Sequence, residues 1–131
     1  MKLTAFQAMA AAMASAAAAK VPNGTVDKAG AKLTHEEFGD VRVYHEGRTD
    51  QLGALTFGSL MLKPGKAPHP PHEHAEEEIM LVTEGTGEIS VEGKVTKVAS
   101  GTSMYCAANK VHGIVNTGKT PLLFYYFKWK A

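Results

Sequence analysis

The sequence has a single cysteine and almost no net charge, and each of these shortages excludes a class of protein. Its one cysteine, Cys106, has no partner for an internal disulfide. Its 14 Lys and Arg residues nearly balance its 13 Asp and Glu residues, and no basic stripe runs along the chain, so nucleic-acid binding is not expected. The 131 residues are 44% hydrophobic, which is enough to build the core of one domain.

The first nineteen residues differ in composition from the rest of the chain. After Met1 and Lys2, residues 3–19 are mostly apolar or small and carry no charge, and Ala17-Ala18-Ala19 supplies a small-x-small cleavage pattern before Lys20. This pattern is typical of a cleavable signal peptide, which predicts a periplasmic or secreted protein. The alternative is an Ala-rich helix at the edge of the domain, in a cytoplasmic protein. The run is short and weakly apolar for a membrane anchor, so no membrane span is expected in the mature chain.

The chain after the leader is predicted to be all-β. Apolar and polar residues alternate in short runs separated by turn residues, and no run has a helical period. We expect residues 20–37 to form a linker or N-terminal segment, and residues 38–131 to form an antiparallel sandwich or barrel. Glu92 and Gly93 are expected to form a two-residue hairpin loop. The expected strands are 41–44, 52–62, 72–82, 88–91, 94–98, 102–106, 111–115 and 122–129.

The last of these strands is apolar on both faces, because aromatic and aliphatic residues fill nearly every position from 122 to 129. A strand covered on both sides is central in its sheet, or one of its sides meets another subunit. The preferred explanation is a homodimer built through sheet faces.

Residues 72–82 carry the most concentrated set of metal-binding side chains. Successive residues of a strand point to opposite faces, so His72, His74, Glu78 and Met80 are expected on one face, with Glu76 among them. Two imidazoles and a carboxylate suit a divalent first-row metal. A second segment, residues 101–116, contributes one more isolated histidine. We expect this residue, His112, to complete the same site.

The two segments resemble the paired motifs of the cupin family. The first motif is matched by Gly65, six residues, His72-Glu73-His74, three residues, Glu78, six residues and Gly85. The second is matched by Gly101, five residues, Ala107-Ala108-Asn109, two residues, His112, three residues and Asn116. The family usually has Pro and Gly in the turn where this chain has Ala107 and Asn109. Asn tolerates the left-handed conformation that Gly supplies, so the turn is expected to survive.

The resemblance implies a fold, a ligand set and a class of cofactor. The fold would be a double-stranded β-helix, or jelly-roll barrel, of antiparallel strands, with the site in its mouth. The implied ligands are His72, His74, Glu78 and His112, and the implied cofactor is a divalent transition metal such as iron, manganese, zinc, nickel or copper. Cupins of this kind are often dimers.

Several neighbouring residues are candidates for a role in the pocket. Glu76 shares the predicted face with Glu78 and is the rival carboxylate ligand, but the family spacing favours Glu78 and leaves Glu76 at the rim. His69 is either an acid–base group at the pocket mouth or an exposed loop histidine. Tyr105 either lines the pocket and hydrogen-bonds a substrate or is a core tyrosine. Met80 is expected to line the cavity floor. The catalytic candidates are therefore His69, Tyr105 and Glu76.

Three functions are compatible with such a site. Three imidazoles and one carboxylate leave two positions open on an octahedral metal. The favoured function is a dioxygenase-type oxidoreductase acting on a small organic molecule. The alternatives are a redox-neutral isomerase, lyase or decarboxylase that uses the metal as a Lewis acid, and a module that binds a small ligand without chemistry.

Overall fold

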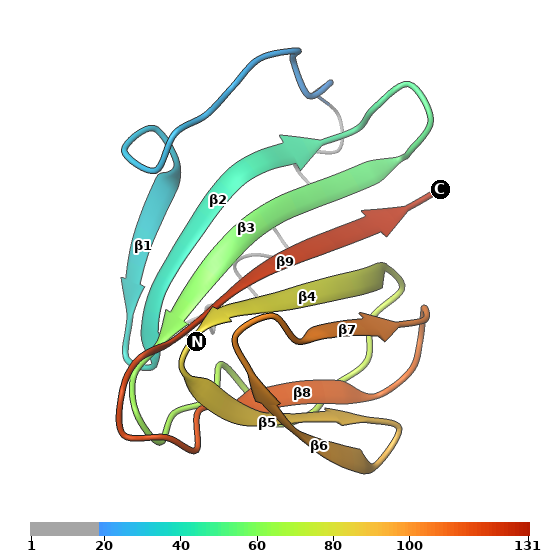
Figure 1. Cartoon of the computed structure of the whole chain (residues 1–131). Coiled ribbons are helices and arrows are strands. Elements are labelled where there is room, and N and C mark those ends of the chain that lie inside the picture. Colours follow the sequence, from blue (N-terminus) through green and yellow to red (C-terminus); the bar gives the residue numbers. More distant parts are fainter. Residues whose placement is uncertain (1–18) are drawn as a thin grey trace, which may run out of the picture.

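The computed structural model describes residues 19–131, which contain nine strands and no helix (Figure 1). The predicted signal peptide therefore lies outside the described residues, apart from Ala19. No helix in residues 19–131 has the length and apolar character needed to cross a membrane. The strands are β1 (Lys32–Glu36), β2 (Gly39–Gly47), β3 (Ala54–Leu62), β4 (Glu77–Glu84), β5 (Thr86–Val91), β6 (Lys94–Ala99), β7 (Ser103–Cys106), β8 (His112–Val115) and β9 (Leu122–Lys130).

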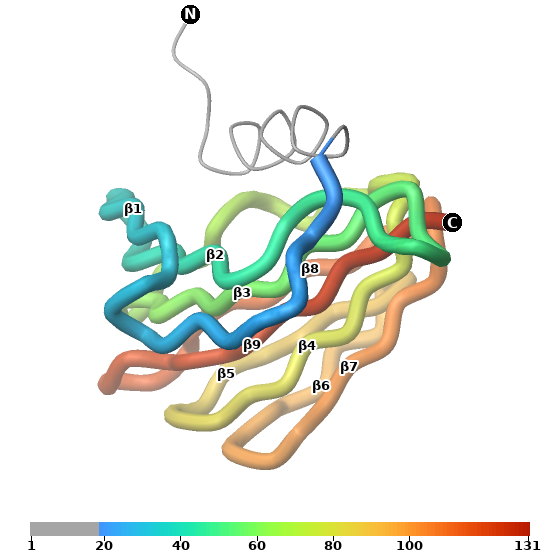
Figure 2. Tube along the Cα trace, turned by 90° about the horizontal axis from the view of Figure 1, so that it is seen from above, coloured from blue at the N-terminus to red at the C-terminus, as the bar shows by residue number. Residues whose placement is uncertain are grey.

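The strands form two antiparallel sheets whose inner faces pack together. The larger sheet has the order β1-β2-β3-β9-β4-β7 and the smaller has the order β6-β5-β8. Seen from above, β9 and β4 lie between the β1–β3 end and the β5–β7 end (Figure 2). The inner faces meet in one apolar cluster to which both sheets contribute, with Leu62, Val82 and Leu122 fully buried on one side and Ile89 and Ile114 on the other. The predicted all-β jelly-roll architecture is confirmed.

Strand β9 lies at the centre of the larger sheet, between β3 and β4, as its two apolar faces predicted. The side chains of Leu122, Phe124, Tyr126 and Lys128 point inward and are buried, while the residues between them are half-buried on the outer face. A lysine thus occupies an inward position at the end of an otherwise apolar or aromatic row.

Both predicted turns with special backbone geometry are present. Glu92 and Gly93 have φ angles of 51° and 83°, as a type I′ hairpin loop requires. Asn109 has a φ angle of 61°, so it adopts the left-handed conformation at the position where the family motif has Gly.

The predicted strand over residues 72–82 begins later than expected. Strand β4 starts at Glu77, because the residues before it follow Pro68, Pro70 and Pro71 and cross toward the smaller sheet. His72 pairs there with His112, and each amide donates to the other's carbonyl at 2.9 Å. The segment expected to be a linker also contributes a strand, β1, which pairs with β2.

Candidate metal centre

Three histidines converge between the two sheets. His72 and His74 lie in the segment before β4, and His112 is the first residue of β8. One ring nitrogen of each lies within 4.8 Å of the others, which is close enough for the three rings to share one ion. The backbone pairing of His72 with His112 positions two of the three rings directly. These are the three histidines that the sequence predicted as ligands.

Glu78 brings a carboxylate to the same point from β4. Its side chain is buried, and its Oε1 atom lies 2.9 Å from Nε2 of His74 and 3.0 Å from Nε2 of His112. Strand alternation explains this placement, because Glu78 shares the inner face with Met80 and Val82. The structure therefore gathers all four predicted ligands.

Backbone carbonyls orient two of the imidazoles. His74 Nδ1 donates to the carbonyl of Glu76 at 2.9 Å, and His112 Nδ1 donates to the carbonyl of Lys110 at 3.0 Å. With Nδ1 acting as donor, Nε2 of a neutral ring carries the lone pair and faces Glu78. Each close contact between Nε2 and Oε1 then requires either a proton or a cation between the two atoms. The donor set thus fits a divalent metal.

The electrostatic environment favours the metal-binding protonation state of two of the predicted ligands, His72 and Glu78. Burial lowers the pKa of His72 to about 3, and the neighbouring histidines act in the same direction, so this ring is neutral at pH 7. Burial alone would raise the pKa of Glu78, but hydrogen bonds from His112 and His74, together with the charge of Lys128, lower it to about 2. A neutral imidazole and an ionised carboxylate are the metal-binding forms. His112 differs, because burial lowers its pKa but the hydrogen bonds to Glu78 and to the Lys110 carbonyl outweigh burial and raise it.

Glu76 and His69 lie beside the cluster rather than in it. The Glu76 carboxylate lies 3.7 Å from His74 Nδ1, so it faces the outer nitrogen of that ring while Glu78 faces the inner one. The ring of His69 lies 3.7 Å from the ring of His72, and its Nδ1 donates to the Pro70 carbonyl at 2.5 Å. His69 is therefore a half-buried neighbour of a predicted ligand rather than an exposed loop residue.

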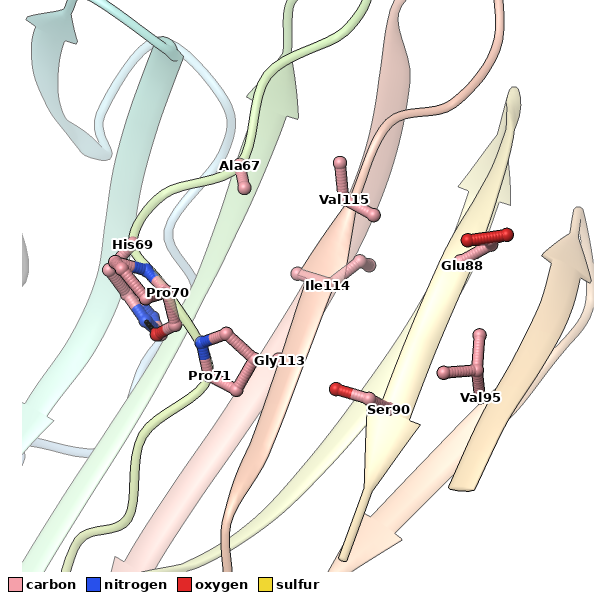
Figure 3. Close-up of a pocket in the computed structure, with 10 residues that line it drawn as sticks. All are labelled: Ala67, His69, Pro70, Pro71, Glu88, Ser90, Val95, Gly113, Ile114 and Val115. Carbon is pink, nitrogen blue, oxygen red and sulfur yellow. Dashed lines mark hydrogen bonds between the residues drawn. The ribbon is translucent and has the colours of Figure 1, made fainter. Parts of the chain in front are cut away.

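His69 separates two hollows of different size. The outer one is a groove of about 470 Å³ between residues 67–71 and strands β8, β5 and β6 (Figure 3). Its lining is apolar except for His69, Glu88 and Ser90. The inner one has about 10 Å³ of free volume and is walled by His69, Met80 and Glu78, among others. Met80 thus lies where it was predicted, in the wall of the cavity beside the ligands.

Tyr105 neither lines this cavity nor lies in the core, so both of its expected positions are corrected. Its side chain lies on the outer face of β7 and is 53% exposed, and its hydroxyl donates to the carboxylate of Glu77. The Glu77 carboxylate also accepts a hydrogen bond from Trp129 Nε1 at 3.1 Å. In β7 the inward positions belong to Met104 and Cys106, and the alternation of the strand turns Tyr105 outward.

Sequence reasoning missed three polar side chains that face the interior near Glu78. Lys128 is 3% exposed, and Thr56 and Tyr126 are each 2% exposed. One signal was available for Lys128, because it follows Leu122, Phe124 and Tyr126 on the same side of its strand.

Comparison with protein families and known structures gives a consistent result. The family model for the cupin domain matches residues 58–127, which is more than half of the chain. No curated protein matches the sequence significantly.

Solved structures with the same fold are numerous, and three illustrate the range. An RmlC-like cupin from Shewanella frigidimarina has a TM-score of 0.72 and 15% identity, covering 85% of this chain and 94% of that one. A predicted oxalate decarboxylase from Thermotoga maritima has a TM-score of 0.66 and 21% identity, covering 82% and 100%. An oxalate oxidase has a TM-score of 0.52 and 22% identity, covering 56% and 41%. At these identities the likeness shows the fold alone.

Proposed function

Because the chain belongs to the cupin family, we propose that it is a metal-dependent enzyme that oxidises a small organic molecule, of the dioxygenase type. The observation that carries this proposal is the convergence of His72, His74, His112 and Glu78 on one point between the sheets. Four protein ligands leave two positions free on an octahedral ion, enough for a substrate oxygen and one further small molecule. A merely structural metal site would instead be closed.

The residues of the chain have different roles at such a site. The three imidazoles and Glu78 hold the ion, and the carbonyls of Glu76 and Lys110 fix the orientation of two rings. Met80 and its apolar neighbours in the cavity wall exclude water from the inner side. A bound iron or manganese ion supplies the redox chemistry with dioxygen.

The size of the inner cavity supports a small substrate. Its free volume of about 10 Å³ matches the space that one water molecule occupies, so only a compact group enters it. A sugar ring does not meet this limit, so the group that approaches the metal must be small. The substrate class we favour is therefore a small organic acid.

The second candidate is redox-neutral chemistry, such as a decarboxylation, with the metal acting as a Lewis acid. It is supported by the likeness to the predicted oxalate decarboxylase, all of whose chain is covered. The fold is shared by both reaction types, so the site must be tested directly.

Oxygen uptake separates these candidates. Protein reconstituted separately with iron and with manganese is incubated with a panel of short carboxylic acids and phenols in an oxygen electrode. We expect uptake that depends on metal and substrate and that His74→Ala abolishes, while Glu73→Gln, at an exposed position, retains it. Turnover that persists without oxygen would contradict the oxygenase and favour a redox-neutral enzyme that uses the metal as a Lewis acid. Metal binding without any turnover would leave a binding module.

We also propose that the protein is a homodimer formed through the outer face of the larger sheet. The support is an apolar surface over β3, β9 and β4, on which Ile79 and Leu81 are 41% and 42% exposed beside Phe57, Phe127 and Trp129. Light scattering should give twice the mass of the chain, and Leu81→Lys should halve it. Val95→Lys is the matched control, because Val95 is 59% exposed on the other sheet. A monomeric wild-type protein would contradict the proposal.

Export of the protein is proposed from the composition of its first nineteen residues. The protein purified from the periplasm or the medium is then expected to begin at Lys20, as N-terminal sequencing would show. A periplasmic chain that still began at Met1 would contradict cleavage.

A further inference from the structure

A row of polar side chains crosses the inner face of the larger sheet beside the metal centre. In the strand register Glu46 pairs with Thr56, Thr56 pairs with Lys128, and Lys128 pairs with Glu78. Directly paired residues of antiparallel strands project to the same face with neighbouring side chains. The row therefore places a buried lysine between a threonine hydroxyl and the carboxylate of Glu78, which would also bind the metal.

Two hydroxyl groups in this region have no hydrogen-bond partner among the described residues. They are Thr56 Oγ1 and Tyr126 Oη, and both side chains are 98% buried. Buried hydroxyl groups are normally paired with protein or with water. A ligand oxygen bound in this region would satisfy them.

The position of Tyr126 is held by a close approach of the backbone. A Cβ atom at Gly58, its partner in β3, would lie 2.5 Å from the Tyr126 hydroxyl, so only glycine leaves room for the phenol to lie across β3. Lys128 Nζ lies 5.7 Å from the centre of the Tyr126 ring, and both residues wall the inner cavity. Burial raises the pKa of the Tyr126 hydroxyl, with the charges of Glu78 and Glu46 adding to the effect, so it stays protonated and able to donate.

The charges of the row become unbalanced when a divalent cation is bound. The positive charges are then those of the ion and of Lys128, and the negative ones are those of Glu78 and the half-buried Glu46. One positive charge is left over in a region shielded from water, where an uncompensated charge is strongly unfavourable. A single negative charge on the ligand would neutralise it.

We propose that Lys128, together with the hydroxyls of Thr56 and Tyr126, forms a subsite for one carboxylate group of the substrate, adjacent to the metal. The proposal rests on the proposed function, since it assumes a cation held by the three histidines and Glu78. The small inner cavity favours a short-chain carboxylic acid over a larger one. Lys128 supplies the charge and the hydroxyls supply two donors, so the subsite discriminates carboxylates from uncharged isosteres.

The test measures binding rather than turnover. Protein loaded with Co²⁺ is titrated with acetate and with acetamide, its uncharged isostere, by calorimetry and by the visible absorption of the cobalt. We expect wild-type protein to bind acetate and to ignore acetamide. Lys128→Met should weaken acetate binding at least tenfold with full cobalt content. Lys130→Met is the matched control, because Lys130 lies two residues further on the same strand and is exposed.

The variants separate a failure of the subsite from a failure of the metal site. Unchanged acetate affinity in Lys128→Met, with cobalt bound, would overturn the subsite and leave the proposed function standing. Wild-type protein that takes up no cobalt or other divalent ion would overturn both. If Lys128→Met does not fold, Thr56→Val and Tyr126→Phe decide, since each removes one hydroxyl with little change of shape. Both should lower the acetate affinity severalfold, and the proposal fails if neither does.

Discussion

Replacing Glu78 by Gln removes a buried negative charge while nearly preserving the shape of the side chain. In the folded protein the pKa of Glu78 falls from 4.5 to about 2, because hydrogen bonds from His112 and His74 and the charge of Lys128 outweigh the opposing effect of burial. At about 1.4 kcal/mol per pKa unit, the ionised form contributes about 3 kcal/mol to the stability of the metal-free protein at pH 7. We expect Glu78→Gln to lose about that much.

The direction of the Glu78 pKa shift determines how the stability changes with pH. The folded pKa lies below the unfolded one, so the stabilisation is complete above pH 4.5 and disappears as the pH falls through 2. Urea unfolding in the presence of a chelator, at a series of pH values, should therefore show a difference between wild type and Glu78→Gln that narrows below pH 4.5. Glu73→Gln, at an exposed position, should match the wild type throughout.

One result would refute this account of Glu78. If metal-free Glu78→Gln is as stable as the wild type at pH 7, the unfavourable burial of the carboxylate cancels its hydrogen bonds. The carboxylate would then be retained for the metal alone. Metal content after dialysis is the second measurement, and we expect Glu78→Gln to retain at least tenfold less metal, because an amide oxygen is a weaker ligand than a carboxylate.

The remaining predictions concern the backbone and acid stability. Gly58→Ala should lower the free energy of unfolding by roughly 1–3 kcal/mol in urea titrations, since its Cβ would lie 2.3 Å from the carbonyl oxygen of Arg42; an unchanged value would contradict this close approach. Asn109→Ala should cost roughly 1 kcal/mol in the same assay, because alanine tolerates a positive φ poorly, and Asn109→Gly should cost nothing. His72 has a folded pKa of about 3 against 6.5, so its contribution to the stability of the metal-free protein is complete above pH 6.5 and is lost toward pH 3. The raised pKa of His112 changes the stability in the opposite direction over the same pH range. The measurement is therefore the difference in the free energy of unfolding between wild type and His72→Gln, which should shrink as the pH falls from 6.5 to 3.

The convergence of His72, His74, Glu78 and His112 could be predicted from the sequence, because the spacing of these residues determines where their side chains meet. Alternation along a strand predicts where Glu78 points, and the motif spacing identifies His112 as its partner from the other sheet. The start of β4 could not be predicted in the same way. A continuous pattern over residues 72–82 does not reveal that His72 pairs with β8 instead of joining the larger sheet.

The misplacement of Tyr105 and the failure to identify Lys128 have a common physical origin. Whether Tyr105 and Lys128 face inward depends on the register of β7 and β9 against β4, which is a pairing between distant segments. Tyr105 was expected either to line the pocket or to lie in the core, but it is exposed, whereas Lys128 is buried although lysine is seldom fully buried. Polarity was a poor guide for both residues, because at a binding site the interior is not uniformly apolar.

The arrangement of the ligands has a consequence for how long the protein lasts in a cell. Glu78 belongs to one sheet and His112 to the other, so an ion held by both would cross-link the two layers. A cation that binds only the folded chain adds stability in proportion to the logarithm of its free concentration. Scarcity of the metal would then lower the stability of the fold as well as the activity. The less stable chain would be degraded faster by proteases, so the amount of protein would follow the supply of the ion.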